Sequence, residues 1–327
     1  WIWLERPGIR RALSAVRSAL LPLALSIPVA FVLIWAGYRF SFGHAPWFSF
    51  PVPFPELFSG IDQVRRHNAQ GHLTYLLGSL STEGWWLYFP VLFAVKTPIA
   101  VLAALAIGLA AGKLRKPADS AAGWAPWLPW VVAAALFAVA INARINIGLR
   151  HLLPAFLFLS VGAAGGLLWL LRSAPARWWA FPCFVLLAVW LPATGAFAHP
   201  DYLPYFNAFA GDHPENIVVD SDLDWGQDMK RLGVRLRELN APYVTFTNHV
   251  VANLDAFGFP PRQHSLPDAP APGWNAVSLT EWKLYRFGLQ MQHPEVRTWP
   301  DFVQPTERVG QTILLYYFPP PAGAPSR

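Results

Sequence analysis

The sequence predicts a polytopic α-helical membrane protein with about five transmembrane helices, followed by a small α/β domain outside the cytoplasm. The 327 residues are 54% hydrophobic and 13% charged, whereas a soluble domain carries roughly 25% charged residues. The apolar residues concentrate in residues 1–198, and residues 199–327 show short strand and helix patterns instead. The apolar part holds 15 basic and 5 acidic residues, against 10 and 14 in the rest. The basic excess therefore belongs to the membrane part, which argues against a nucleic-acid surface.

Five stretches in residues 1–198 are apolar over close to the roughly 20 residues that cross a bilayer. They are Leu20–Tyr38, Trp85–Ala111, Trp124–Ile141, Leu152–Leu171 and Trp178–Phe197. Several carry Trp or Tyr near their ends, as side chains at membrane interfaces do. We expect each stretch to form one membrane-spanning helix.

The connectors between these stretches predict their orientation. Three segments, "ERPGIRRALSAVR", "KLRK" and "RSAPAR", hold nine of the 15 basic residues and fall on one side if the five helices alternate. The positive-inside rule assigns that side to the cytoplasm. The other side then receives the loop 39–84, the turn "NARINIGLRH" and everything after His199. The chain begins with Trp1 inside "WIWL", from which we expect a fragment that lacks an N-terminal part.

The segment 199–327 has the pattern of a separate α/β domain. Apolar residues recur at helical spacing from Met229 to Leu239 and predict an amphipathic helix from about Trp225 to Leu239, which "NAP" ends. The Pro-rich segment "FPPRQHSLPDAPAPGW" is expected to be a loop. The predicted strands are "NIVVD" (216–220), "YVTFT" (243–247), "NAVSLT" (275–280) and "TILLYYF" (312–318).

Motifs of soluble enzymes are not found. The one cysteine, Cys183, lies in an apolar run, so no intrachain disulfide is expected. The nine histidines lack metal-ligand spacing, and the chain has no nucleophile elbow, Walker loop or dinucleotide fingerprint. No cofactor is required by the sequence, no metal ligand is assigned, and dependence on a divalent metal stays open.

Lys96 lies in the middle of the second apolar stretch and has two interpretations. A lysine in mid-membrane costs about 2.5–3.5 kcal/mol on insertion scales, so it faces a cavity or a partner such as a lipid phosphate. In the alternative, "WWLYFPVLFAV" lies along the membrane interface and Lys96-Thr97-Pro98 marks the start of the helix. The two interpretations are compatible if phosphate binds at the outer interface.

The predicted outer side carries further polar candidates. The turn "NARINIGLRH" places Arg144, Arg150 and His151 at the mouth of two helices, where guanidinium groups suit a phosphate. The alternative is that they anchor lipid headgroups. In "GHLTYLLG", His72 and Tyr75 are three residues apart and are expected on one helical face, although a single loop histidine is more often structural.

The segment "DSDLDWGQD" (220–228) places four carboxylates in nine residues. Counted as a calcium loop, it has Trp225 at the sixth position, which needs glycine, and Arg231 at the twelfth, which needs glutamate. The loop therefore fails as an EF-hand. The alternative is a strand end followed by a helix N-terminus, where acidic residues cap the first turn. A ligand or metal role for these carboxylates also stays open.

Three blocks together resemble a known family. "GHLTYLLGSLSTEGWWLYFPVLFAVKTP" (71–98), "NIGLRHLLPAFLF" (146–158) and "HPDYLPYFNAFAG…VVDSDLDWGQDMKRL" (199–232) are similar to bacterial glycosyltransferases of the protein-mannosyltransferase type. These are family 39-like enzymes with the GT-C fold, related to the lipid A aminoarabinose transferases. The motif that carries the resemblance most specifically contains Asp220, Asp224, Trp225, Gln227 and Asp228.

The resemblance implies a multi-helix body in the bacterial inner (plasma) membrane with a periplasmic C-terminal domain. Such enzymes transfer a sugar from a polyprenyl-phosphate carrier to a lipid, glycan or protein acceptor outside the cytoplasm. The chain departs from the family at Asp222, where Asn is usual, and at Leu87, where an aromatic residue is usual. The catalytic acid of the family lies in an N-terminal half that this chain lacks, so no catalytic residue is transferred.

The chemistry of such a transfer needs a carboxylate base for the acceptor and cations for the departing phosphate. Lys96, Arg144 and Arg150 are the candidates for the second task, and a lipid-linked donor needs no Asp-x-Asp metal site. The competing class is a non-enzymatic membrane protein, such as a flippase for a lipid carrier or an assembly component with a periplasmic interaction domain.

Overall fold

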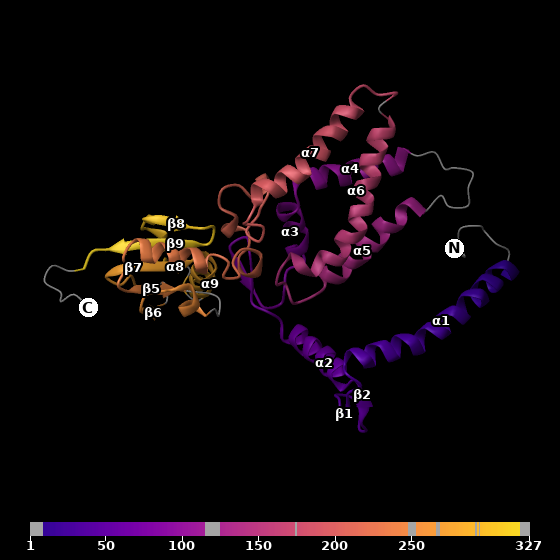
Figure 1. Ribbon diagram of the computed structural model, residues 1–327, viewed down its shortest axis with the longest axis horizontal. Helices are drawn as coiled ribbons and strands as arrows, with labels where there is room; N and C mark the ends of the chain where they lie inside the picture. Colours follow the sequence, from indigo (N-terminus) through magenta and orange to yellow (C-terminus); the bar gives the residue numbers. More distant parts are fainter. Residues whose placement is uncertain are drawn as a thin grey trace.

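The computed structural model describes the chain in seven segments: residues 9–114, 125–173, 175–247, 253–265, 269–291, 293 and 295–320. Figure 1 shows an α/β unit at one end, a group of apolar helices α3 to α7 beside it, and an arm formed by α1, α2 and the hairpin β1–β2. Several residues used in the predictions lie outside the described segments: Trp1, 5–8, Arg115, Lys116, Trp124, 266–268 and 321–327.

The apolar part is mostly helical. Its helices are α1 (Ile9–Gly37), α2 (Pro55–Gln70), α3 (Tyr88–Lys96), α4 (Ile99–Leu114), α5 (Leu128–Ile141), α6 (Leu153–Ser173) and α7 (Ala180–Ala198), with the 3₁₀ turns η1 (Ala125–Trp127) and η2 (Leu149–Leu152). Two antiparallel hairpins complete it. They pair β1 (Phe42–Gly43) with β2 (Val52–Pro53), and β3 (Thr74–Leu76) with β4 (Ser79–Ser81).

The number of candidate membrane spans is smaller than predicted. Among the described residues, Leu149–Ser173 and Ala180–Ala198 are long and apolar enough to cross a membrane, and the bent pair α3–α4 is a third if it counts as one span. The apolar segment Ala24–Gly37 and helix α5, with 14 residues, fall short of the roughly 20 that a span needs. The structure therefore supports two or three spans, where the sequence predicts about five.

The predicted helix Trp85–Ala111 is wrong as a single element. It is broken into α3 and α4, which meet at an angle of 109°. Pro98 causes the break, because it lacks an N–H group and its ring forces the preceding residue out of the helical region. Thr97 accordingly has the extended angles φ −80° and ψ 130°. The position of the break agrees with the alternative in which Lys96-Thr97-Pro98 marks the start of a helix.

Glycines allow α4 and α6 to pack closely. A Cβ atom on Gly166 would lie 2.4 Å from the carbonyl oxygen of Ala104, and one on Gly108 would lie 2.4 Å from that of Gly162. Trp130 of α5 packs on Gly162 from the other side. Small residues that bring helix backbones together are typical of helix pairs in membranes, where dispersion contacts replace the hydrophobic effect.

Helix α1 follows the predicted stretch Leu20–Tyr38 but extends away from α4–α7 (Figure 1). Its apolar side chains face outward, and Leu33 is 66% exposed. The hairpin at its end also exposes aromatic side chains, among them Phe42 and Trp47. Apolar surface of this extent needs a lipid or protein environment.

The α/β unit is built on a mixed five-stranded sheet with the strand order β6-β5-β7-β9-β8. Strands β6 and β7 run parallel to β5, whereas β9 runs antiparallel to both β7 and β8. The strands and helices are α8 (Met229–Glu238), β5 (Val244–Thr247), β6 (Arg262–His264), β7 (Gly273–Ser278), α9 (Leu279–Gln290), β8 (Glu307–Val309) and β9 (Ile313–Phe318). The 3₁₀ turns are η3 (Ala208–Ala210), η4 (Pro214–Asn216), η5 (Asp220–Asp222), η6 (Leu254–Phe257) and η7 (Trp299–Asp301).

The sheet separates two apolar layers, because successive side chains of a strand point to opposite faces. On one face, Ala276 and Leu315 pack with Leu232 and Leu236 of α8. On the other face, the alternate residues of the same strands pack with α9 and with residues of the segment 216–223. Each fully buried Leu contributes about 1.5–3 kcal/mol by leaving water.

The outcome of the strand and helix predictions differs along this unit. The strands predicted at 243–247, 275–280 and 312–318 are confirmed as β5, β7 and β9. The strand predicted at 216–220 is wrong, because this segment turns from η4 to η5 and buries Val218 and Val219 in two different apolar clusters. The segment predicted as a Pro-rich loop contains β6 and the first residues of β7.

Candidate functional site

The apolar helices and the α/β unit are joined at Asp222. This side chain is 4% exposed. One carboxylate oxygen accepts a hydrogen bond of 2.9 Å from the hydroxyl of Tyr88, and the other accepts one of 2.9 Å from the backbone N–H of Leu149. The neighbouring Ser221 donates from its hydroxyl to the carbonyl of Ile147 at 2.6 Å. The turn 146–149, helix α3 and the acidic motif therefore meet at one point.

Lys96 closes the same junction from the end of α3. Its ammonium nitrogen donates to the carbonyl oxygens of Leu203 and Asp222, each at 2.6 Å, and lies 4.3 Å from the ring centroid of Phe206. A cation is favourable at a helix C-terminus, where carbonyl groups lack partners in the helix. Lys96 therefore links α3 to the segment that follows α7.

Two buried asparagines complete the junction. Asn207 donates from its side chain to the carbonyls of Ala94 and Thr97, at 2.6 and 2.7 Å, and thereby satisfies the last turn of α3. Asn146 accepts from the backbone N–H of Trp85 at 2.6 Å. The sequence analysis did not single out these residues. Their signal in the sequence is an amide side chain inside an otherwise apolar or aromatic segment.

An open cluster of cations and histidines lies beside this junction. His72 Nδ1 is 3.2 Å from His67 Nε2, and its Nε2 is 3.9 Å from a carboxylate oxygen of Asp220. Arg150, at the start of η2, is exposed and acts electrostatically on both His72 and His151. Within the described part of the chain, its guanidinium has no carboxylate partner. The geometry therefore brings His72, Arg150 and Asp220 together, although they are far apart in sequence.

The titration of two groups follows from their surroundings. Burial lowers the pKa of His72; the Asp220 carboxylate opposes this effect, and the charges of His67 and Arg150 add to it. His72 is consequently neutral at pH 7. Burial raises the pKa of Asp222, and the Lys96 charge and two hydrogen bonds oppose this only in part. Folding therefore favours the protonated form of Asp222, so the stabilisation is complete below the ordinary value of 3.8 and is lost as the pH rises through the folded value.

Other predicted site residues lie elsewhere. Arg144 forms an exposed ion pair of 2.9 Å with Glu83. Tyr75 lies in strand β3, so the expected common helical face with His72 is wrong. The ring of Tyr75 is buried, and its hydroxyl donates to the carbonyl of Asn216 at 3.1 Å. Burial raises the pKa of Tyr75 to about 12.

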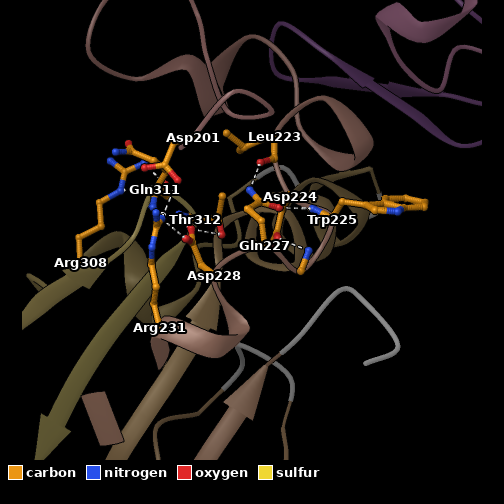
Figure 2. A network of polar contacts seen from close by, with 11 residues as sticks. Asp201, Leu223, Asp224, Trp225, Gln227, Asp228, Arg231, Arg308, Gln311 and Thr312 are labelled. Atoms are coloured by element: carbon orange, nitrogen blue, oxygen red, sulfur yellow. Dashed lines mark hydrogen bonds and ion pairs between the residues drawn. The ribbon is translucent and has the colours of Figure 1, made fainter. Parts of the chain in front are cut away.

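The remainder of the acidic motif forms a fixed turn (Figure 2). Asp224 accepts from the backbone N–H of Gly226 at 3.0 Å and from the hydroxyl of Ser278 at 2.7 Å. Gln227 accepts from the backbone N–H of Trp225 at 2.8 Å and donates to the carbonyl of Leu223 at 2.8 Å. Gly226 supplies the φ of +83° that this turn needs. Helix α8 therefore begins at Met229 and not near Trp225, as the apolar spacing predicts.

Asp228 precedes α8 but does not cap it with its side chain, as the capping interpretation expects. Its fully buried carboxylate accepts instead from the backbone N–H groups of Gln311 and Thr312, at 2.7 and 3.0 Å, and from the Thr312 hydroxyl at 2.9 Å. Its other oxygen accepts from Arg231 at 2.7 Å, and Arg231 also binds Asp201 at 2.6 Å. Asp228 thus holds the turn between β8 and β9 (Figure 2).

Trp225 extends away from both of these networks, as Figure 2 shows. Its side chain is 58% exposed, and the guanidinium carbon of Arg150 lies 5.6 Å from the centroid of its ring. The acidic motif therefore presents one large aromatic side chain beside the cluster of His72, Arg150 and Asp220.

No group of three or more His, Cys, Asp or Glu side chains that could hold a metal ion occurs among the described residues. A hollow of about 510 Å³ opens on α2 next to this cluster, and His67 and Arg66 are among its lining residues. No protein-family model, curated protein or solved structure matches this chain in comparisons with known proteins.

Proposed function

We propose that this chain belongs to a membrane glycosyltransferase that transfers a sugar from a polyprenyl-phosphate carrier to an acceptor outside the cytoplasm. In this proposal, the helices lie in the bacterial inner membrane and the α/β unit lies in the periplasm. The acceptor is a lipid, a glycan or a protein. The two or three apolar helices that could span a membrane are consistent with a lipid-linked substrate.

One observation carries the proposal. The three sequence blocks that resemble the glycosyltransferases are separated along the chain, yet all three supply atoms to the same junction. Asp222 of the third block contacts Tyr88 of the first and Leu149 of the second. Ser221 and Thr74 repeat this connection by bonding the carbonyls of residues 147 and 146. The residues that carry the resemblance thus form one structural unit at the end of the apolar helices.

The open cluster beside the junction fits the carrier phosphate. When the bond between the sugar and the phosphate oxygen breaks, the leaving polyprenyl phosphate gains one negative charge. A fixed cation at that position stabilises the transition state more than the ground state. Arg150 has five N–H donors and no carboxylate partner among the described residues, and the neutral His72 beside it adds a further donor. We assign the phosphate to Arg150 and His72, with His151 at the edge of the site.

Lys96 and Arg144 fit other tasks better. Lys96 already donates to the carbonyls of Leu203 and Asp222, so its removal would loosen the junction and would not test phosphate binding alone. Arg144 is paired with Glu83. The proton of the acceptor hydroxyl must pass to a base when the new bond to the sugar forms, and we assign no base among the described residues.

The experiment uses the full-length protein in lipid vesicles with a synthetic polyprenyl-phosphate hexose that carries a labelled sugar. The release of polyprenyl phosphate and the transfer of label to membrane acceptors are measured. We expect Arg150→Ala to lower turnover by roughly 100-fold or more, as the loss of one donor to a developing charge does. Unchanged turnover in Arg150→Ala would refute the assignment.

Arg65→Ala is the matched control, because Arg65 is an exposed arginine on the same side that is already paired with Asp62. Its turnover should equal that of the unmodified protein. If the carrier crosses the vesicle membrane while its sugar is never released, the chain belongs to the non-enzymatic class of carrier flippases, and the proposal is wrong.

A further inference from the structure

The acidic motif spends several hydrogen bonds on one exposed side chain. Asp224 and Gln227 fix the backbone from Leu223 to Gln227 through three bonds of 2.8–3.0 Å. The side chain that this turn presents is Trp225, which is 58% exposed. A rigid turn around an outward-facing indole lowers the conformational entropy that a ligand must overcome on binding. Trp and Arg are also the side chains that most often dominate binding energies.

The position of the indole identifies its ligand. The guanidinium of Arg150, to which the proposed function assigns the carrier phosphate, lies 5.6 Å from the ring centroid of Trp225. In a polyprenyl-phosphate sugar, a single oxygen joins the sugar ring to the phosphate. A phosphate held by Arg150 therefore brings its sugar within reach of this indole and not of a more distant aromatic side chain.

The chemistry of the two rings is complementary. The face of an indole is electron-rich, and the C–H groups on one face of a sugar ring are weakly positive and apolar. We propose that Trp225 is the stacking platform for the transferred sugar, so that Arg150 and Trp225 together read the phosphate and the ring of one donor. This inference rests on the proposed function, because it takes the phosphate position from it.

The test measures binding of two probes to the full-length protein in nanodiscs by titration calorimetry. The first probe is farnesyl phosphate esterified with a hexose, prepared with mannose and with glucose. The second is farnesyl methyl phosphate, a diester of the same charge that lacks the ring. The unmodified protein should bind at least one hexosyl probe more tightly than the methyl probe.

Trp225→Ala should weaken binding of that hexosyl probe by roughly 5-fold, the order expected for one stacked ring, and leave the methyl probe unchanged. Trp225→Tyr should retain most of the difference. Trp47→Ala is the matched control, because Trp47 is 55% exposed and has Arg65 5.8 Å from its ring centroid. It should change neither affinity.

Two results would overturn the sugar platform. The first is that neither hexosyl probe binds more tightly than the methyl probe. The second is that Trp225→Ala weakens both probes equally, as a lipid anchor or a purely structural residue would, or weakens neither. Failure of the proposed function gives a different result, because Arg150→Ala would then leave the affinity for the methyl probe unchanged.

Discussion

The carboxylate of Asp228 offers the sharpest test of what the acidic motif does. It is fully buried and accepts four hydrogen bonds: from the N–H groups of Gln311 and Thr312, from the Thr312 hydroxyl and from Arg231. The turn it holds is close, since a Cβ atom on Gly310 would lie 2.0 Å from one of its oxygens. Asp228→Ala removes the acceptor and leaves all four donors in place.

The expected cost follows from these contacts. The Thr312 hydroxyl can rotate, and Arg231 keeps its bond to Asp201. The two backbone N–H groups have no such alternative, and each buried donor left without a partner costs about 1–3 kcal/mol. Removal of one partner from a buried charged network costs about 3–5 kcal/mol. We therefore expect a loss of about 3–5 kcal/mol, which lowers the melting temperature of a unit of this size by roughly 10–20 °C.

The assay combines thermal unfolding with hydrogen exchange of the full-length protein in detergent. The amides of Gln311 and Thr312 should lose protection in Asp228→Ala, while the amides of β7 retain it at low temperature. Asp255→Ala is the control, because Asp255 is an exposed aspartate whose salt bridge to Arg262 contributes little. If both variants melt together, or if residues 311–312 stay protected, Asp228 does not hold this turn.

Two further predictions concern the junction and the helix packing. Asp222→Asn should raise the melting temperature at pH 7 and have no such effect below about pH 3.8, because folding favours the neutral form of this carboxyl; a stabilisation that does not change with pH would contradict this reasoning. Gly166→Ala should destabilise the apolar helices in an SDS titration, because its Cβ would lie 2.4 Å from the carbonyl of Ala104. Gly165→Ala should not, since no atom lies within 4 Å of its Cβ, and equal effects of the two substitutions would disprove close packing at Gly166.

The sequence predicts elements well where one local pattern decides the structure. Strands β5, β7 and β9 are short runs of β-branched and aromatic residues, and the helices α6 and α7 are long apolar runs. Helix α9 was missed, although a signal for it exists. Ser278 and Glu281 have the spacing of a capping box, and the Ser278 hydroxyl does accept from the backbone N–H of Glu281.

Local patterns fail where distant residues decide the structure. The segment 216–220 has the composition of a strand, but Val218 packs against α3 and Val219 against the sheet, so no strand can satisfy both. The hydroxyl of Tyr88 binds a carboxylate 134 residues away, and no sequence pattern signals such a contact. The approach of His72 to Asp220 depends on the same long-range folding.

The candidate site shows the same division. Arg150 was predicted from its position at the mouth of two helices, and it does lie in an open cluster. Lys96 was equally conspicuous as a charge in an apolar run, yet the bend at Pro98 turns it toward the carbonyls of Leu203 and Asp222. The sequence identifies an unusual charge, but only the path of the backbone determines whether its donors are already used.

The hydrogen bonds of the acidic motif explain why it looks like a metal loop without having the geometry of one. The carboxylate of Asp222 binds Tyr88 and a backbone N–H, and that of Asp228 binds the turn before β9. Asp224 holds the turn around Gly226 and the start of α9. Three of the four acids therefore point in different directions, each toward N–H or O–H donors from a different element. A shared cation would require them to converge. Their common result is to fix Trp225 beside Arg150, so the function of the motif is better sought at that indole than at the carboxylates.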